Sequence, residues 1–183
     1  MRYYYLALSL TLLIYGCAST GEIANPPAYE LIRPGSTLQL KETLAIPEQL
    51  ARVYFQYGKV VPKKSINRYD PSCNLLSYVV LGQEQIIHPD EFKVLQVSNK
   101  TELVQAEPIL LASNKVYGGS LLRDRDGPMA EVFYITLEIR SDKNPDIKRF
   151  ECEAWRNLPL GKHLSLEEIQ QALGNIIDIK LSE

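Results

Sequence analysis

The sequence predicts a mainly β domain, an antiparallel β-sandwich or barrel with one short C-terminal helix at about residues 165–173. Three observations support this fold class. Apolar and polar residues alternate in several short segments, turn-forming residues separate these segments, and one late segment has helical periodicity. Many short strands followed by one helix are typical of antiparallel sandwiches and barrels. The 11 tyrosines, against 4 phenylalanines and 1 tryptophan, add to the β preference of the chain.

The first half of the predicted domain contains four strand segments, at 38–46, 52–57, 73–81 and 92–97. Successive side chains of a strand point to opposite faces. In the second segment we therefore expect Val53, Phe55 and Tyr57 to face the core, and Arg52, Tyr54 and Gln56 to face away from it. The first segment places its apolar residues on one common face, namely Leu38, Leu40, Leu44 and Ile46.

The clearest predicted strand spans residues 132–140, where every second residue is apolar. Residues 141–146 are rich in turn formers, so 147–155 is expected to return as the hairpin partner of this strand. Residues 112–129, which include two adjacent glycines, predict a long loop. The core-facing residues of the clearest strand are Phe133, Ile135, Leu137 and Ile139.

One amphipathic helix is predicted close to the end of the chain. Ser165 and Glu168 have the spacing of a capping box, in which the serine side chain accepts a hydrogen bond from the third helical N–H and the glutamate reaches back. Gly174 is expected to end this helix. Its apolar stripe consists of Leu166, Ile169, Ala172 and Leu173. Residues 176–181 then alternate weakly as a last strand.

The first residues of the chain have the pattern of an export signal. Met1 and Arg2 give a positive start, and residues 3–15 are uncharged and mainly apolar. An apolar run of about 13 residues has the length of a signal-peptide core and is too short to cross a bilayer. Residues 18–34 contain three prolines and little apolar patterning, which predicts a flexible tether.

Leu13-Ile14-Tyr15-Gly16-Cys17 resembles the lipobox of bacterial lipoproteins, although Tyr15 is larger than the residue usual at its position. In that family a diacylglycerol is attached to the cysteine thiol, and the signal is cut before the cysteine. The resemblance implies that Ile14 and Gly16 are recognition residues and that Cys17 carries the lipid. The alternative is an ordinary secretory signal that contains a cysteine by chance. Several acyl chains make membrane attachment effectively permanent.

The lipobox resemblance also implies a location and a division of the chain. Ala18, rather than an aspartate, follows the cysteine. In a Gram-negative host this implies transport to the outer membrane, with the domain facing the periplasm. The expected division is a signal peptide at 1–16, a lipidated N-terminus and tether at 17–34, and one β-rich periplasmic domain at 35–183. No cofactor is expected apart from the covalent lipid on Cys17.

The other two cysteines, Cys73 and Cys152, are expected to form a structural disulfide in an oxidising periplasm. Such a bridge would close a loop of about 80 residues. Two buried free thiols and half of a metal site are the alternatives. The sequence contains no CxxC motif or cysteine–histidine cluster that would complete a metal site.

The composition argues against nucleic-acid binding. The net charge is −2, and the 20 basic residues form no large block. The two histidines, His88 and His163, are isolated in the sequence and are expected to be polar surface residues. Gly118-Gly119-Ser120 lacks the pattern of a nucleophile elbow.

Two short charged segments are candidate binding loops. One consists of Arg68, Tyr69 and Asp70 just before Cys73, although the favoured role of this trio is to pin the loop beside the disulfide. The other consists of Arg123, Asp124, Arg125 and Asp126. Alternating charges of this kind usually belong to a solvated turn, and Pro128 and the lack of a later glutamate argue against a calcium loop. No metal site is expected.

Segments 51–58, 68–73 and 163–168, with Cys152 and Trp155, are similar to an uncharacterised group of Gram-negative envelope lipoproteins over about residues 35–175. The resemblance implies an envelope protein and no particular mechanism. We therefore expect a non-enzymatic β-domain that binds another envelope protein. A small-ligand or lipid-binding barrel with an apolar interior pocket is the alternative. A cell-wall-active enzyme using carboxylates such as Asp90 and Glu91 is a third hypothesis.

Overall fold

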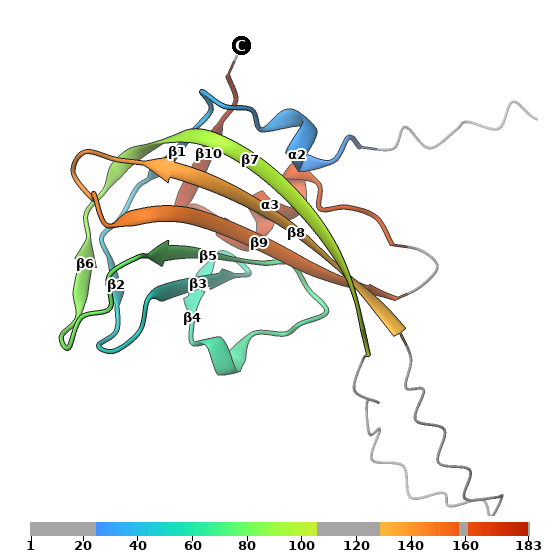
Figure 1. Ribbon diagram of the computed structural model, residues 1–183, viewed down its shortest axis with the longest axis horizontal. Coiled ribbons are helices and arrows are strands. Elements are labelled where there is room, and N and C mark those ends of the chain that lie inside the picture. The colour runs from blue at the N-terminus through green and yellow to red at the C-terminus, as the bar shows by residue number, and fades with distance from the viewer. Residues whose placement is uncertain (1–24, 106–128, 158–160, 183) are drawn as a thin grey trace, which may run out of the picture.

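The computed structural model describes residues 25–105, 129–157 and 161–182 of the 183-residue chain. Strands dominate this part of the chain (Figure 1). The helical elements are α2 (Ala28–Leu31), the 3₁₀ turn η2 (Lys63–Ser65) and α3 (Leu166–Leu173). The strands are β1 (Thr37–Leu40), β2 (Leu44–Ile46), β3 (Arg52–Gln56), β4 (Lys59–Val61), β5 (Ser72–Ser77), β6 (Gln85–Ile87), β7 (Asp90–Gln105), β8 (Met129–Arg140), β9 (Ile147–Asn157) and β10 (Ile177–Lys180).

Eight strands form one sheet, curled into a half-barrel, in the order β10-β1-β7-β8-β9-β5-β3-β4. Every pairing in this sheet is antiparallel. The predicted fold class, mainly β and antiparallel with one short C-terminal helix, is confirmed. Within the described residues, no helix combines the length and the apolar character needed to span a bilayer.

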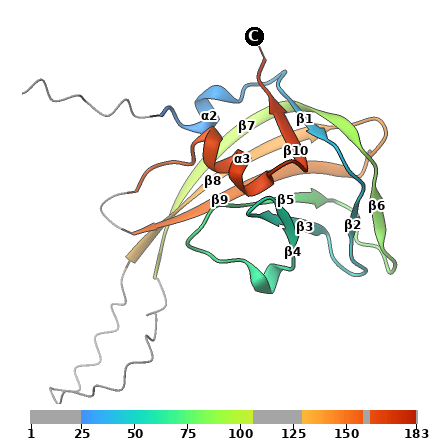
Figure 2. The same ribbon diagram turned by 180° about the vertical axis from the view of Figure 1, so that it is seen from behind.

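The apolar core lies between the curled sheet and α3. α3 lies behind β8 and β9 in Figure 1 and in front of the sheet in Figure 2, and it contacts β3, β5 and β10. The predicted strand pattern of β8 is confirmed, because Phe133, Ile135, Leu137 and Ile139 are all buried. Ile169, Ala172 and Leu173 of α3 pack into the same core. Because these buried residues of β8 occupy every second position, the residues between them point to the opposite face of the sheet.

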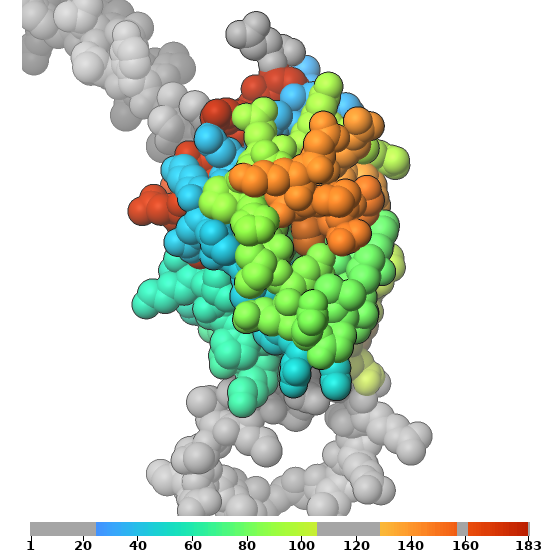
Figure 3. Space-filling model, turned by 90° about the vertical axis from the view of Figure 1, so that its left-hand side faces the viewer, coloured from blue at the N-terminus to red at the C-terminus, as the bar shows by residue number. Residues whose placement is uncertain are grey.

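A separate two-stranded sheet, β2 with β6, lies at one end of the molecule. The sequence predicts a single strand across 38–46, and this is wrong, because the chain turns between β1 and β2. β1 ends at Leu40, a bend at Glu42 follows, and β2 pairs with β6 rather than with the large sheet. Leu50, Val80 and Ile86 are exposed near this small sheet. Figure 3 shows the surface of the segment around residue 80 in green.

The β3–β4 hairpin corrects the predicted facing of two residues. Tyr57 and Gly58 form its two-residue turn with φ values of 54° and 71°, the combination of a type I′ turn. Tyr57 is therefore 61% exposed rather than in the core. Gln56 is buried instead, because its side-chain amide donates to the carbonyls of Asn67 and Asp70 and accepts from the Asn67 N–H.

The packed structure begins before Gly35, so the predicted end of the tether at residue 34 lies too late. Pro27 is the N-cap of α2, with φ −57° and ψ 144°, and the helical residues begin at Ala28. Ala28 and Ile32 are fully buried in the core, and the Ala28 N–H donates to the carbonyl of Leu164 at 2.8 Å. Prolines that predict an extended tether instead begin a short helix that packs on the domain.

The predicted disulfide between Cys73 and Cys152 is present. The two cysteines are directly opposite each other on β5 and β9, with a Cα–Cα distance of 4.0 Å. Both are 1% exposed, so the bridge lies inside the core and links the centre of the sheet.

The predicted capping box of α3 is also present. The Ser165 hydroxyl accepts from the Glu168 N–H, and the Glu168 carboxylate accepts from the Ser165 N–H. We expect Ser165→Ala to lower the free energy of unfolding by about 1 kcal/mol, because the Glu168 N–H loses its side-chain acceptor. Urea unfolding measures this loss, with Ser65→Ala at an exposed site as the control. An equal loss in both variants would contradict the assigned role of the cap.

Candidate functional site

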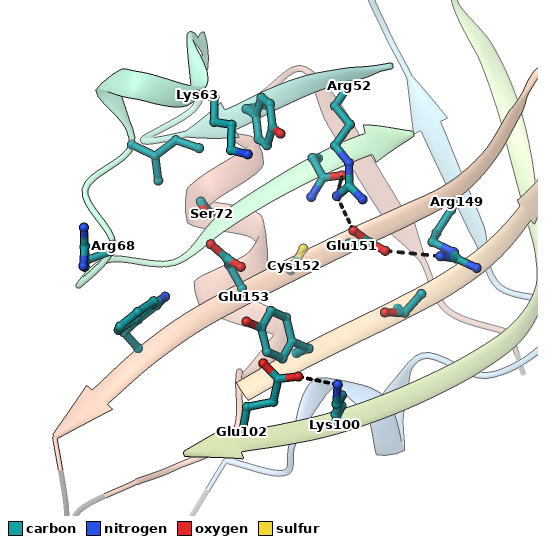
Figure 4. Close-up of a pocket in the computed structure, with 16 residues that line it drawn as sticks. Arg52, Lys63, Arg68, Ser72, Lys100, Glu102, Arg149, Glu151, Cys152 and Glu153 are labelled. Atoms are coloured by element: carbon teal, nitrogen blue, oxygen red, sulfur yellow. Dashed lines mark hydrogen bonds and ion pairs between the residues drawn. The ribbon is translucent and has the colours of Figure 1, made fainter. Parts of the chain in front are cut away.

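A polar groove of about 890 Å³ lies on the face of the sheet that is opposite α3 (Figure 4). It crosses β7, β8, β9, β5 and β3, and the segment after β4 forms one wall. Charged and aromatic side chains dominate its lining. The lining residues are Arg52, Tyr54, Lys63, Ile66, Arg68, Ser72, Asn74, Lys100, Glu102, Tyr134, Thr136, Arg149, Glu151, Cys152, Glu153 and Trp155.

Strand alternation explains why these side chains share one face. On β9, Phe150, Cys152 and Ala154 belong to the core, so Glu151 and Glu153 between them face the groove. The strand register aligns these positions into rows across the sheet. One row contains Lys100, Tyr134, Glu153 and Ser72. A neighbouring row contains Ser98, Thr136, Glu151, Asn74 and Tyr54.

Arginines from β3 and β9 compensate the charge of Glu151. Its carboxylate lies 2.5 Å from Nη1 of Arg52 and 3.6 Å from Nη1 of Arg149. Arg52 also donates to Oδ1 of Asn74 at 3.0 Å, and Arg149 forms an ion pair of 2.7 Å with Glu138. These contacts fix both guanidinium groups in place. Glu151 is therefore a structural carboxylate that ties three strands together on the groove floor.

Glu153 differs from Glu151 in its surroundings. Among the residues that the structure describes, no side chain makes an ion pair or hydrogen bond with its half-buried carboxylate. Burial and the charge of Glu151 raise the pKa of Glu153 above the ordinary 4.5, while Arg52 and Lys63 partly oppose this. The groove floor therefore holds a carboxylate whose charge lacks direct compensation.

A tyrosine and an ion pair line the β7 and β8 side of the groove. Lys100 and Glu102 form an ion pair on β7. Burial, together with the nearby carboxylates of Glu153 and Glu102, raises the pKa of Tyr134 to about 12. Tyr134 is therefore a neutral phenol at physiological pH, and its hydroxyl donates a hydrogen bond to the Glu102 carboxylate.

The structure separates the roles of Arg68, Tyr69 and Asp70. Only Arg68 lines the groove, where its guanidinium lies 5.2 Å from the ring centroid of Trp155. The Asp70 carboxylate accepts from the Tyr57 hydroxyl at 2.6 Å and from Nδ2 of Asn67, and thereby holds the loop. The Tyr69 N–H donates to Asn67. Cys17, Ile14, Gly16 and the segment Arg123, Asp124, Arg125 and Asp126 lie outside the described residues.

The histidines take no part in the groove. His88 is exposed, and its N–H donates to Oδ1 of Asn144. His163 is half-buried, with its ring 5.1 Å from that of Tyr29 and 4.7 Å from that of Phe133. Aromatic packing, rather than simple solvent exposure, therefore explains His163. The described part of the chain contains no cluster of three or more histidine, cysteine, aspartate or glutamate side chains arranged to hold a metal ion.

The sequence reasoning missed most of the groove. The sequence nevertheless contains one sign of the groove. In 147–155, the charged residues Arg149, Glu151 and Glu153 alternate with the core residues of the strand. One charged strand face is ordinary surface in most proteins. The register with Tyr134 and Ser72, which only the structure supplies, turns this face into part of a groove.

We expect Glu153→Gln to raise the free energy of unfolding at about pH 7. The pKa of Glu153 is higher in the folded chain than in the unfolded chain, so its ionisation destabilises the fold as the pH rises through the interval between the two values. The glutamine variant does not ionise. Its advantage should therefore disappear below the ordinary pKa of 4.5. Thermal unfolding at about pH 7 and about pH 3.5 measures the difference, and a pH-independent difference would contradict this explanation.

No protein-family model matches the chain, and no curated protein or solved structure matches it.

Proposed function

We propose that this chain is a lipid-anchored protein of the bacterial outer membrane whose non-enzymatic β-domain binds another envelope protein through the polar groove. The observation that carries this proposal is the groove itself, which is about 890 Å³ in volume, crosses five neighbouring strands and is lined mainly by charged and aromatic side chains. Aromatic and arginine side chains are the residues on which protein recognition most often depends. An open groove of this kind suits an extended segment of a partner protein.

The character of the groove favours a protein partner over a lipid. A lipid-binding barrel requires an apolar interior pocket. Within the described residues, the space between the sheet and α3 is filled by core side chains such as Phe55, Phe92 and Phe150. The groove lies on the other face and presents arginines, lysines and glutamates. A polar small ligand is the alternative occupant.

The arrangement of the carboxylates argues against a cell-wall-active enzyme. Asp90 and Glu91 are neighbours on β7 and point to opposite faces of the strand, so they do not converge on one substrate atom. Among the described lining residues, Glu151 is engaged by Arg52 and Arg149 and Glu102 by Lys100, which leaves Glu153 without a second unengaged carboxylate. General acid–base catalysis with two carboxylates needs both groups available.

The anchor part of the proposal rests on the lipobox resemblance at Cys17. The core disulfide is consistent with an oxidising compartment. Intact mass of the chain extracted from membranes tests the anchor. The expected mature chain begins at Cys17 and carries acyl groups, and Cys17→Ala should abolish both features. A soluble, unmodified chain cut elsewhere would contradict the anchor.

A substitution that fills the groove tests partner binding. Thr136 lines the groove floor on β8, whereas Thr101 is exposed on β7 outside the groove lining. We expect Thr136→Trp to abolish recovery of a partner from detergent-solubilised envelopes, because the indole would occupy the space for the partner segment. Thr101→Trp should leave recovery unchanged. A partner recovered equally with both variants would show that binding occurs elsewhere.

A further inference from the structure

The charges in the groove are unequally compensated. Arg52, Arg149 and Lys100 all form ion pairs with glutamates. Arg68 lies against the ring of Trp155. Glu153, by contrast, has no ion-pair or hydrogen-bond partner within the described part of the chain. The groove therefore contains one carboxylate for which the fold supplies no direct counter-charge.

Two aromatic side chains adjoin this carboxylate. Tyr134 is its direct cross-strand neighbour on β8, and Trp155 follows two positions later on the same face of β9. Side chains at such positions are close enough to touch a common ligand. Figure 4 shows Glu153 pointing into the hollow between the β7–β8 side and the Arg68 segment. A carboxylate beside two aromatic rings provides both parts of a cation site, namely ionic attraction and cation–π attraction.

We propose that Glu153, with Tyr134 and Trp155, receives a positively charged side chain, arginine or lysine, from the segment that binds in the groove. This inference rests on the proposed function and specifies the partner chemistry at the same site. A half-buried carboxylate favours a counter-charge, because pairing restores the interactions that burial has removed. Arg68 against Trp155 shows that this wall already accepts a guanidinium group in the folded chain.

Lysine and arginine side chains in the lining do not by themselves favour an anionic partner. Arg52 on β3 is paired with Glu151, Arg149 on β9 with Glu138, and Lys100 on β7 with Glu102. An anion that bound to one of these cations would have to displace its glutamate. A cation at Glu153 displaces none of these pairs. Lys63, on the opposite wall, lies close enough to act on the charge of Glu153 and would compete with an incoming cation.

Trp155 makes the site directly measurable, because it is the single tryptophan of the chain and lines the groove. The full-length protein in detergent is titrated with three capped tripeptides, Gly-Arg-Gly, Gly-Glu-Gly and Gly-Gly-Gly, while Trp155 fluorescence is recorded. We expect saturable binding of the arginine peptide alone, with a dissociation constant on the order of millimolar. Glu153→Gln should weaken it at least about tenfold, as expected for loss of a charge-assisted contact. Glu91→Gln, at an exposed glutamate outside the groove, should leave it unchanged.

A second variant keeps the test decisive. Lys63→Ala should strengthen binding of the arginine peptide a few-fold, because it removes a competing cation. Binding that is unchanged by Glu153→Gln, preference for the glutamate peptide, or no arginine-dependent change up to about 10 mM would each overturn the inference. Failure of the peptide test together with loss of the envelope partner in Thr136→Trp would retain the groove as the binding site and reject only the cation at Glu153. Failure of the peptide test together with unchanged recovery of the envelope partner in Thr136→Trp would reject both the groove and the cation at Glu153.

Discussion

Replacing Cys73 and Cys152 together by alanine is expected to lower the free energy of unfolding by about 4–5 kcal/mol. The bridge joins residues 79 apart in the sequence, so it removes a large loop-closure entropy from the unfolded chain. It also lies in the core, where both cysteines are 1% exposed. The melting temperature should fall by on the order of 10 °C. Thermal unfolding of the double variant and of the unreduced wild type measures this loss.

The control for this prediction is the reduced wild-type chain. It lacks the bridge but keeps both sulfur atoms, so it separates the covalent effect from the loss of packing. We expect reduction to account for most of the loss. A double variant that unfolds at the wild-type temperature would contradict the stabilising role of the bridge.

Gly174→Ala is expected to lower the free energy of unfolding by about 3–5 kcal/mol, the sum of backbone strain and overpacking. Gly174 ends α3 with φ 58° and ψ −129°, a conformation that disfavours any side chain. A Cβ atom built there would lie 2.5 Å from the Cα atom of Gly58 in the β3–β4 turn. Backbone, rather than a flexible side chain, causes this conflict. Urea unfolding followed by circular dichroism measures the effect.

Gly82→Ala is the matched control for Gly174→Ala. No atom lies within 4 Å of a Cβ built at Gly82, and this residue is not among the glycines with positive φ. Its substitution should change the free energy of unfolding by less than about 0.5 kcal/mol. Similar losses at both positions would show that close packing of the α3 terminus against the β3–β4 turn does not limit stability.

Local patterns in the sequence were sufficient to predict several elements. The β8–β9 hairpin follows from short-range alternation, the capping box of α3 from a three-residue spacing, and the Cys73–Cys152 bridge from the cysteine count. Each depends on residues that are close in sequence or on a small set of possible partners. Such features are visible without the fold.

Features that depend on distant contacts were not predictable in this way. Gln56 is polar and occurs in an alternating segment, yet it is buried because backbone carbonyls of the 67–71 loop accept its amide hydrogens. Pro27 suggests an extended tether, yet α2 begins there because Ala28 and Ile32 find space in the core. In both cases tertiary packing overrides the local signal.

The groove was inaccessible to sequence reasoning for the same physical reason. Its lining residues come from β3, β5, β7, β8 and β9, and these strands are neighbours only after the sheet has formed. Glu153 is separated from Tyr134 by the β8–β9 hairpin and from Ser72 by most of the domain, although register places all three in one row. The different environments of Glu151 and Glu153 also arise only in the folded chain.

Photo-crosslinking from the groove floor in living cells tests the central claim most directly. A benzophenone amino acid is placed at Tyr54, which lines the groove, and in a second strain at Thr101, which is exposed outside the lining. The proposal predicts one discrete adduct with an envelope protein from position 54 and none from position 101. It also predicts that this adduct is lost when Thr136→Trp is present. The absence of any adduct from the groove position, or the same adduct from both positions, would contradict the assignment of this groove as the binding site.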